Sequence, residues 1–520
     1  MSVIKQIVRN TLSGWLAVGI RGALALIIVP FLLNHLGKEG FGLIGILGVI
    51  VSMAAVADLG LRGALGRELA EQLARNDLKI YSELASTALV LYFCLACVLG
   101  FAGWLLAPWV VEVLKVSEAM YEDAVSSIRI YGILSIILSF ITPVFSAALS
   151  SFHRFDLINS VQLIVGIISS VTLFVVIPVV ENPLYGWVGV MLVSELSILF
   201  LSIIFFRKFC NGAEIGLSYL NIKRLIPLFH LGGYLYVIQL AQTLTNTANS
   251  IVLSFFLGPI SVALYQPASK LSAMFNPIVM TLAEQLFPLT TKFHTTENKE
   301  KLQETFLWGT KYTLLLGGFV SVNIFIFSEP LARLWLYDSL GDDYLVVVQV
   351  MKIFAIVDLM TYAAGTQWPV LLGMKKLRYL SILLVVTAIL NILVSIFFVG
   401  FTAVGVAGVL YGTIISKFIR IILLTLHVLE LLKVRFFVFF RFSILGPLSC
   451  LFFSALCAWI LINNYSCDTW IDLMSMVAAT TTVWLFCFWF IGLNFNERSH
   501  IVAAIKKIRG KSGSKPQNPV

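Results

Sequence analysis

The sequence predicts an all-α integral membrane protein with about fourteen transmembrane helices. Three observations predict it: the composition, the lengths of the apolar runs and the placement of the positive charges. The 520 residues are 59% hydrophobic and 12% charged, and the mean hydropathy is +0.95. Soluble domains contain about 25% charged residues, so half that share over this length indicates many membrane spans.

The apolar runs divide the chain into helices, because about 20 apolar residues are needed to cross a bilayer. The first run has no small-residue cleavage site, so we expect it to remain as a membrane anchor and not to be removed as a signal peptide. The predicted spans, in order, are 12–33, 41–62, 83–107, 125–149, 157–180, 187–206, 230–257, 262–289, 306–327, 344–371, 379–400, 403–428, 443–463 and 470–492.

The lysines and arginines test this division through the positive-inside rule. If the N-terminus is cytoplasmic, most of them lie in cytoplasmic segments, and the opposite loops contain Lys38, Lys115, Arg129 and Arg333. Both termini are therefore expected in the cytoplasm. The net charge of +9 then reflects topology, and the basic tail is expected to lie on anionic lipid and not on nucleic acid.

Similar short segments recur about 220 residues apart, which indicates an internal repeat. The pairs are HLGKEGFGLIG (35–45) with FLGPISVALYQ (256–266), GWVGV (186–190) with GVAGV (405–409), and SSFHRFD (150–156) with LGMKKLR (372–378). An even number of helices in each repeat predicts two lobes related by an axis along the membrane normal. The expected parts are an N-lobe at 1–210, a C-lobe at 211–440, two further helices at 441–492 and a cytoplasmic tail at 493–520.

Polar residues inside the spans are the candidates for a substrate cavity, because a charge at the bilayer centre costs about 2.5–3.5 kcal/mol on insertion scales. Lys270 and Gln266 are four residues apart and share one face of the eighth helix. The seventh helix contains a polar run that lipid alone would not tolerate. The candidate cavity residues are Arg21, Gln242, Asn246, Asn249, Gln266 and Lys270.

A second set of charged residues is a candidate for gating or ion coupling and consists of Asp58, Glu284, Lys352 and Asp358. Asp58 lies four residues before Arg62, so a local ion pair explains it nearly as well as gating. Lys352 and Asp358 do not share a helix face, so each needs a partner elsewhere. Glu195 in the sixth helix is expected to be protonated and hydrogen-bonded between helices, outside the cavity lining.

The sequence contains no pattern typical of catalysis or metal binding. GxxxxGK[ST] is absent, so we do not expect this chain to hydrolyse ATP. Cys94 and Cys97 form a CxxC, but within an apolar run, where buried hydrophobic positions are expected. We predict no catalytic residue, no metal and no cofactor. Short predicted outer loops favour transport over a membrane glycosyltransferase or polymerase.

Two stretches near the N-terminus carry a resemblance to a known family. They are NTLSGWLAVGIRGALALIIVPFLLNHLGKEGFGLIG (10–45) and ADLGLRGALGRELA (57–70), and the second contains a DLG element that begins at Asp58. A further shared feature lies later in the chain, where an LG turn at Gly258 is followed by Tyr265. These features resemble Wzx-type polysaccharide flippases of the multidrug/oligosaccharidyl-lipid/polysaccharide (MOP) exporter superfamily. Many relatives have an aspartate late in helix 7, where this chain has TNTANS (245–250), so the resemblance does not extend to a carboxylate there.

The resemblance implies two six-helix lobes in a pseudo-twofold, MATE-like arrangement and a cleft lined by helices 1, 2, 7 and 8. It implies a flippase in the bacterial inner membrane that moves undecaprenyl-pyrophosphate-linked repeat units for O-antigen, capsule or exopolysaccharide synthesis. Alternating access would be driven by H⁺ or Na⁺. Implied partners are a polysaccharide polymerase and a chain-length regulator. Arg21 and Lys270 would then face the anionic head group.

Other readings share parts of this evidence. A lipid II flippase would have the same fold and a cationic cavity, and helices 13 and 14 could flank a groove for the lipid tail. A MATE-type multidrug antiporter would need an acidic or aromatic cavity, which Arg21 and Lys270 disfavour. A non-transporting scaffold for a polymerase is a further alternative.

Overall fold

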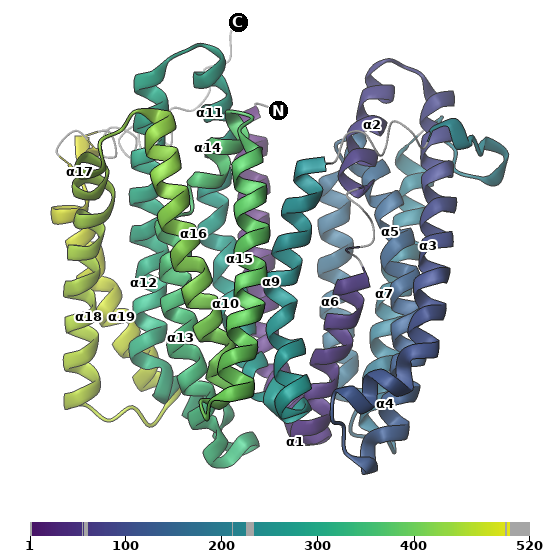
Figure 1. The fold of residues 1–520 in the computed structure, drawn as a ribbon, viewed down its shortest axis with the longest axis horizontal. Helices are drawn as coiled ribbons and strands as arrows, with labels where there is room; N and C mark the ends of the chain where they lie inside the picture. The colour runs from purple at the N-terminus through teal and green to yellow at the C-terminus, as the bar shows by residue number, and fades with distance from the viewer. Residues whose placement is uncertain are drawn as a thin grey trace, which may run out of the picture. The chain divides into compact units, whose positions relative to one another are not determined.

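The computed structural model consists of helices joined by turns and short loops, with no strand among the residues that it describes (Figure 1). These are residues 3–54, 56, 61–210, 212–224, 233–494 and 497–499, without the side chains of 3–18, 21, 61–64 and 233–235. The fold class predicted from the composition is confirmed. Apolar runs form helices in a membrane because a helix satisfies every internal backbone hydrogen bond within itself.

The described helices agree with the predicted spans, since each predicted range overlaps at least one helix. The first group is α1 (Val3–Ala54), α2 (Leu61–Ala74), α3 (Leu78–Val113), α4 (Tyr121–Ser127), the π-helical turn η3 (Ile128–Gly132), α5 (Ile133–Ser151), α6 (Phe155–Val176) and α7 (Pro183–Phe209). The second group is α9 (Gly233–Leu257), α10 (Pro259–Glu284), α11 (Leu286–Thr295), α12 (Lys299–Leu340), α13 (Tyr344–Ala363), α14 (Gln367–Gly373), α15 (Leu377–Phe401) and α16 (Gly408–Leu432). The last are α17 (Phe436–Phe439), α18 (Gly446–Asn464) and α19 (Trp470–Cys487).

Ten stretches of the described chain are long and apolar enough to cross a membrane. One of them, Lys299–Gly373, contains three helices in sequence, α12, α13 and α14. The chain is therefore a multi-pass membrane protein, while the count of fourteen spans stays a prediction.

Helix α1 contains the first predicted span, 12–33, and the start of the second, 41–62; its course changes between them, at Gly37. Gly37 has φ 70°, a conformation that glycine adopts without the penalty that a Cβ brings. Gly258, in the matching LG turn between α9 and α10, has φ 79°. The two turns that resemble each other in sequence thus also share a backbone conformation.

Positive φ angles recur at three more pairs of positions about 220 residues apart, as a repeat of this length requires. The pairs are Asn76 with Glu297, His153 with Lys375, and Gly212 with Lys433. Left-handed residues are uncommon outside glycine, so their recurrence in the same order indicates the same turns. The lobe boundaries at 210 and 440 stay a prediction.

Two compact units make up the chain by internal contacts. Unit 1 comprises Met1–Ile278, Trp335–Phe354 and Lys375–Ile422, and unit 2 comprises Val279–Leu334, Ala355–Met374 and Leu423–Val520.

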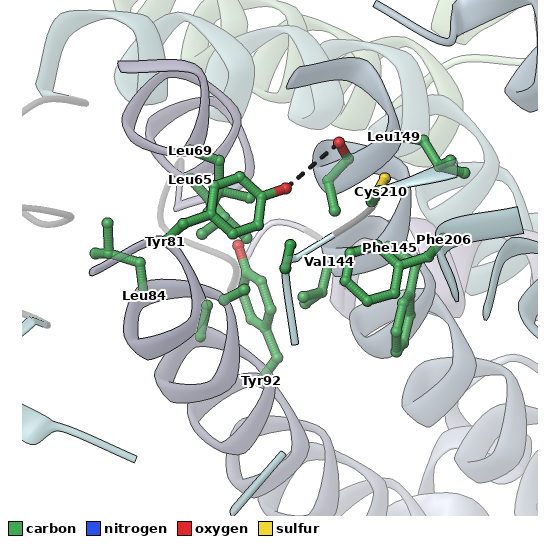
Figure 2. Packing of buried hydrophobic residues seen from close by; sticks show 14 of the residues in the cluster. Leu65, Leu69, Tyr81, Leu84, Tyr92, Val144, Phe145, Leu149, Phe206 and Cys210 are labelled. Carbon is green, nitrogen blue, oxygen red and sulfur yellow. Dashed lines mark hydrogen bonds between the residues drawn. The ribbon is translucent and has the colours of Figure 1, made fainter. Parts of the chain in front are cut away.

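Helices α2, α3, α5 and α7 of unit 1 enclose a buried cluster (Figure 2). Its members include Leu65, Leu69, Tyr81, Leu84, Tyr92, Val144, Phe145, Leu149, Phe206 and Cys210. The hydroxyls of Tyr81 and Ser151 are hydrogen-bonded at 3.0 Å, which satisfies two polar groups inside the cluster. This packing makes the short helix α2 part of the bundle and fixes it beside α5.

Helix α3 has an outward face made of apolar side chains, including Phe93, Val98 and Phe101. A large exposed apolar surface is expected where lipid covers the protein. Cys94 and Cys97 are also exposed, so the prediction that they are buried is wrong. The segment around the two cysteines is apolar because it faces outward, and not because it is buried among protein side chains.

Candidate functional site

Lys270 lies on α10, and the face that it shares with Gln266 is packed near the second half of α1. The Lys270 ammonium is 5.8 Å from the centroid of the Phe41 ring. A methyl group on Gly45 would lie 2.8 Å from the Gln266 amide nitrogen. The structure thus brings the two predicted residues together on one side of α10, against α1.

Glycine makes this close approach of α1 and α10 possible. A methyl group on Gly42 would lie 2.0 Å from the carbonyl oxygen of Pro259, far inside van der Waals contact. The helices cross where one has no side chain, so the backbones come close. The close crossing therefore keeps Lys270 next to α1.

The ammonium of Lys270 has no carboxylate partner among the residues that the structure describes, and Lys270 is exposed. Its described neighbour is the aromatic face of Phe41, which attracts a cation weakly, by about 0.5–1 kcal/mol at exposed sites. A cation that is not neutralised by an acid remains able to bind an anion.

Arg21 belongs to α1, but its side chain lies outside the described residues, as does Asp58 altogether. The next residue, Gly22, packs against Met274, one turn after Lys270 on α10. The backbone of α1 at Arg21 is therefore near the α10 segment that contains Lys270, and the role of Arg21 stays a prediction.

The polar run of α9 separates into an exposed and a buried part. Gln242 and Asn246, one turn apart, are exposed, whereas Asn249 is buried. The Asn249 amide donates hydrogen bonds to the hydroxyls of Tyr265 and Thr413, at 3.3 and 3.1 Å. Of these three candidate cavity residues, Asn249 joins helices, and the role of the exposed Gln242 and Asn246 stays a prediction.

Asn249 is one member of a buried amide and hydroxyl cluster that we name the Asn391 cluster, formed by Asn249, Tyr265, Asn391, Ser395 and Thr413. Asn391 donates to the Asn249 carbonyl oxygen at 3.5 Å and accepts from Thr413 at 3.2 Å. Ser395 donates to the backbone oxygen of Val409 at 3.2 Å. The cluster ties α9, α10, α15 and α16 together by uncharged groups.

Sequence reasoning did not single out Asn391, Ser395 or Thr413. A signal was present, since each is a polar residue within an apolar run and polar groups in a span need partners. Which helix supplies the partner depends on tertiary packing, so the sequence did not reveal the cluster.

The candidates for gating or ion coupling differ in their surroundings. Glu284, the last residue of α10, is exposed, and Lys352 on α13 is half-buried. Asp358, later on α13, is 5% exposed. These positions neither establish nor remove a coupling role, and the assignment stays a prediction.

Metal ligands do not cluster in the described part of the chain, where no group of three or more His, Cys, Asp or Glu side chains could hold an ion. Glu195 is hydrogen-bonded to two hydroxyls on other elements, as the sequence led us to expect.

Comparison with known proteins agrees with this architecture. Residues 7–294 match the family described as polysaccharide biosynthesis protein. A Shigella flexneri protein named as an O-antigen transporter is 24% identical over 293 residues, which is 55% of this chain and 66% of that protein.

Two kinds of solved structure share the fold. The lipid II flippase MurJ in an inward closed conformation has a TM-score of 0.67 at 16% identity, covering 91% of this chain and 97% of that one. An inward-facing multidrug resistance MATE transporter of the MOP superfamily has a TM-score of 0.66 at 17% identity, covering 79% and 95%. At such identities the likeness shows the fold and not the cargo. The chain belongs to the polysaccharide biosynthesis protein family, and it is a multi-pass membrane protein that shares the fold of MurJ and the MATE transporter.

Proposed function

We propose that the protein is a flippase for undecaprenyl-pyrophosphate-linked oligosaccharide repeat units in the bacterial inner membrane. The repeat units would be used for O-antigen, capsule or exopolysaccharide synthesis. Both termini would be cytoplasmic, as the distribution of lysine and arginine predicts. A polysaccharide polymerase and a chain-length regulator would act on the product at the outer face.

The observation that carries this proposal is Lys270, an exposed cation without a described acidic partner on α10, a helix that the sequence predicts to span the membrane. A pyrophosphate head group needs a positive charge along its path, because an unpaired anion is very unfavourable in a low-dielectric interior. Gln266, one turn before Lys270, and the exposed amides of Gln242 and Asn246 would hydrogen-bond the head group or the sugars. Arg21 would supply a bidentate donor.

Transport would follow alternating access between two lobes, with the glycan in a hydrated cleft and the polyprenyl chain in the bilayer. An H⁺ or Na⁺ gradient would drive the cycle. Asp58, Glu284, Lys352 and Asp358 are proposed for gating or coupling, with Asp358 the best shielded from water among those that the structure describes.

A positive site argues against export of organic cations, which Lys270 would repel. A lipid II flippase remains the second candidate, since the MurJ fold covers 91% of this chain and lipid II also presents a pyrophosphate. The head group cannot separate these two, so the test must identify the sugar.

The test is extraction of lipid-linked intermediates from a strain that lacks this chain but retains its glycan pathway. We expect undecaprenyl-pyrophosphate-linked repeat units to accumulate at the cytoplasmic face, and mass spectrometry identifies the glycan. Wild type should clear them, Lys270→Ala should not, and Lys270→Arg should clear them in part. Lys208→Ala, which removes an exposed lysine at the end of α7, is the matched control.

Accumulation of lipid II alone would replace the proposed cargo by the second candidate. Clearance by Lys270→Ala equal to that of wild type would remove the site and keep the flippase. No accumulation of any lipid-linked glycan would overturn the proposed function.

A further inference from the structure

A carboxylate of unit 1 has one oxygen without a partner. Glu195 lies near the middle of α7, inside the predicted span 187–206. Its Oε1 accepts hydrogen bonds from the Ser135 hydroxyl at 2.8 Å and from the Tyr131 hydroxyl at 3.2 Å. Its Oε2 is buried and has no hydrogen-bond partner among the described residues. Buried polar atoms are rarely left in this condition, so each one needs an explanation.

Both donors are held in place by packing. Ser135, near the start of α5, is 0% exposed, and Tyr131, in η3, is 7% exposed. The Tyr131 ring packs on Trp187, with the ring centroids 5.1 Å apart. Trp187 lies two turns before Glu195 on α7, so α7 itself positions the tyrosine that binds its carboxylate. The carboxyl group is therefore oriented through Oε1.

Glu195 also lines a cavity of about 800 Å³. Its wall is formed by α2, α5, α6 and α7 and contains Arg67, Ser139, Thr142, Ser146 and Gln162. Hydroxyls and amides of this kind hold water, and a water molecule occupies about 30 Å³ of the liquid. The cavity is large enough for a hydrogen-bonded group of waters next to the carboxyl group.

Few charges are available to neutralise Glu195. From η3, Tyr131 contacts Glu195, whereas Arg129 donates to the backbone oxygen of Trp104; α2 contributes Arg67 to the cavity wall. The lining residues from α5 and α6 include no titratable side chain, and no lining residue comes from α1. No described cation forms an ion pair with Glu195. An ionised carboxylate with one unpaired buried oxygen is unfavourable in a membrane span, and protonation removes the charge.

We propose that Glu195 is the proton-binding site of this transporter, filled from the open cavity that α2, α5, α6 and α7 line. A proton from cavity water forms a bond to Oε2 and converts the carboxylate to the neutral acid. Tyr131 and Ser135 donate to Oε1 in both states, so they keep the group in place. Release returns the proton to water and leaves the carboxylate. Exchange requires a rotation of the side chain that brings Oε2 to the cavity.

A metal cation fits this site less well than a proton. Hard cations take several oxygen ligands, and Glu195 meets two hydroxyl oxygens here. The inference rests on the proposed function, because it names the ion that would drive transport and the residue that binds it. Glu195 is separate from Lys270, the residue proposed to contact the anionic head group.

The first experiment measures the proton without any glycan. Infrared difference spectra of the full chain in phospholipid vesicles are recorded as the pH is varied. We expect the C=O stretch of a protonated carboxylic acid in wild type, its loss in Glu195→Gln and a shifted frequency in Tyr131→Phe. Glu181→Gln, which changes an exposed carboxylate just before α7, is the matched control and should keep the signal. Identical spectra for wild type and Glu195→Gln would overturn the proposal, as would removal of the signal by Na⁺ at constant pH.

The second experiment connects the proton to export. Surface glycan is measured across a range of external pH in the deletion strain carrying wild type, Glu195→Gln or Glu181→Gln. Wild type and Glu181→Gln should restore glycan with the same pH dependence, and Glu195→Gln should lose export at normal protein levels. Equal export by Glu195→Gln at every pH would overturn the coupling role. If wild type itself restores nothing, the proposed function fails, and the infrared result alone decides whether Glu195 binds a proton.

Discussion

The side-chain amide of Asn249 donates a hydrogen bond to the hydroxyl of Thr413 at 3.1 Å, although the two residues are 164 positions apart. Tyr265 and Asn391 complete the contacts of Asn249, so the buried amide is paired on each side. In a bilayer no water is available to replace such partners. Part of the polarity of α9 therefore holds helices together.

Asn391→Ala is expected to lower the free energy of unfolding by about 1 kcal/mol, the usual scale of hydrogen bonds between membrane helices. Asn391 is 0% exposed, and its removal leaves Thr413 and Asn249 with fewer partners. Thermal unfolding in detergent measures the effect. The control is Asn246→Ala, which changes an exposed residue of α9 and should alter stability little. An equal loss of stability in both variants would show that the Asn391 cluster contributes no more to the free energy of unfolding than an exposed amide does.

Gly42→Ala is expected to destabilise the fold by about 1–3 kcal/mol, because overpacking forces neighbouring backbone to move. The added methyl group would lie 2.0 Å from the Pro259 carbonyl oxygen. Gly48→Ala, on the same helix, meets nothing within 4 Å and serves as the matched control. Equal melting temperatures for the two variants would contradict the close crossing of α1 and α10.

Glu497→Gln is expected to lower stability by about 3–5 kcal/mol, the cost of leaving one member of a buried ion pair unpaired. Lys311 on α12 contacts both Glu497 oxygens at 2.9 Å, and the two side chains are 4% and 1% exposed. A double variant, Lys311→Met with Glu497→Leu, should recover much of the loss.

The control for the ion pair is Glu71→Gln, which removes an exposed pair with Arg75 and should cost less than about 0.5 kcal/mol. A Glu497→Gln variant as stable as wild type in denaturant titration would mean that the pair does not anchor the segment after α19.

Cys210 is expected to make the folded state less stable as the pH rises from about 9 to about 11. Burial raises the pKa of the Cys210 thiol from an ordinary value of 9.0 to about 11. In that range the unfolded chain releases the thiol proton while the folded chain keeps it, so stability falls with increasing pH. Below pH 9 both states are protonated, and the contribution is constant.

The measurement is the difference in unfolding free energy between wild type and Cys210→Ala at several pH values. The subtraction cancels the contribution of lysines and tyrosines, which titrate in the same pH range, to the unfolding free energy. Between pH 9 and 11 the unfolding free energy of wild type should fall relative to that of Cys210→Ala. Parallel curves of unfolding free energy against pH for the two proteins would contradict a raised thiol pKa.

The helices could be predicted from the sequence because they depend on local properties. An apolar run of sufficient length becomes a span in lipid whatever its neighbours are, so each predicted range overlaps a helix. The repeat was also visible locally, since His153 and Lys375 terminate helices in matching turns with the same backbone conformation. Gln266 and Lys270 were correctly expected to share a face, because helical spacing alone requires it.

By itself the sequence determined the class of protein, the approximate positions of its helices and the presence of a cation at Lys270, since hydropathy and helical periodicity act over a few residues. Only the tertiary structure decided that Asn249 is paired with Thr413, that Cys94 and Cys97 face outward, and that one oxygen of Glu195, beside a cavity, has no partner among the described residues. The physical reason is that the partners of a polar atom in a membrane determine whether it is hydrogen-bonded or left unpaired. Those partners come from helices far apart in the chain, and only packing brings them together.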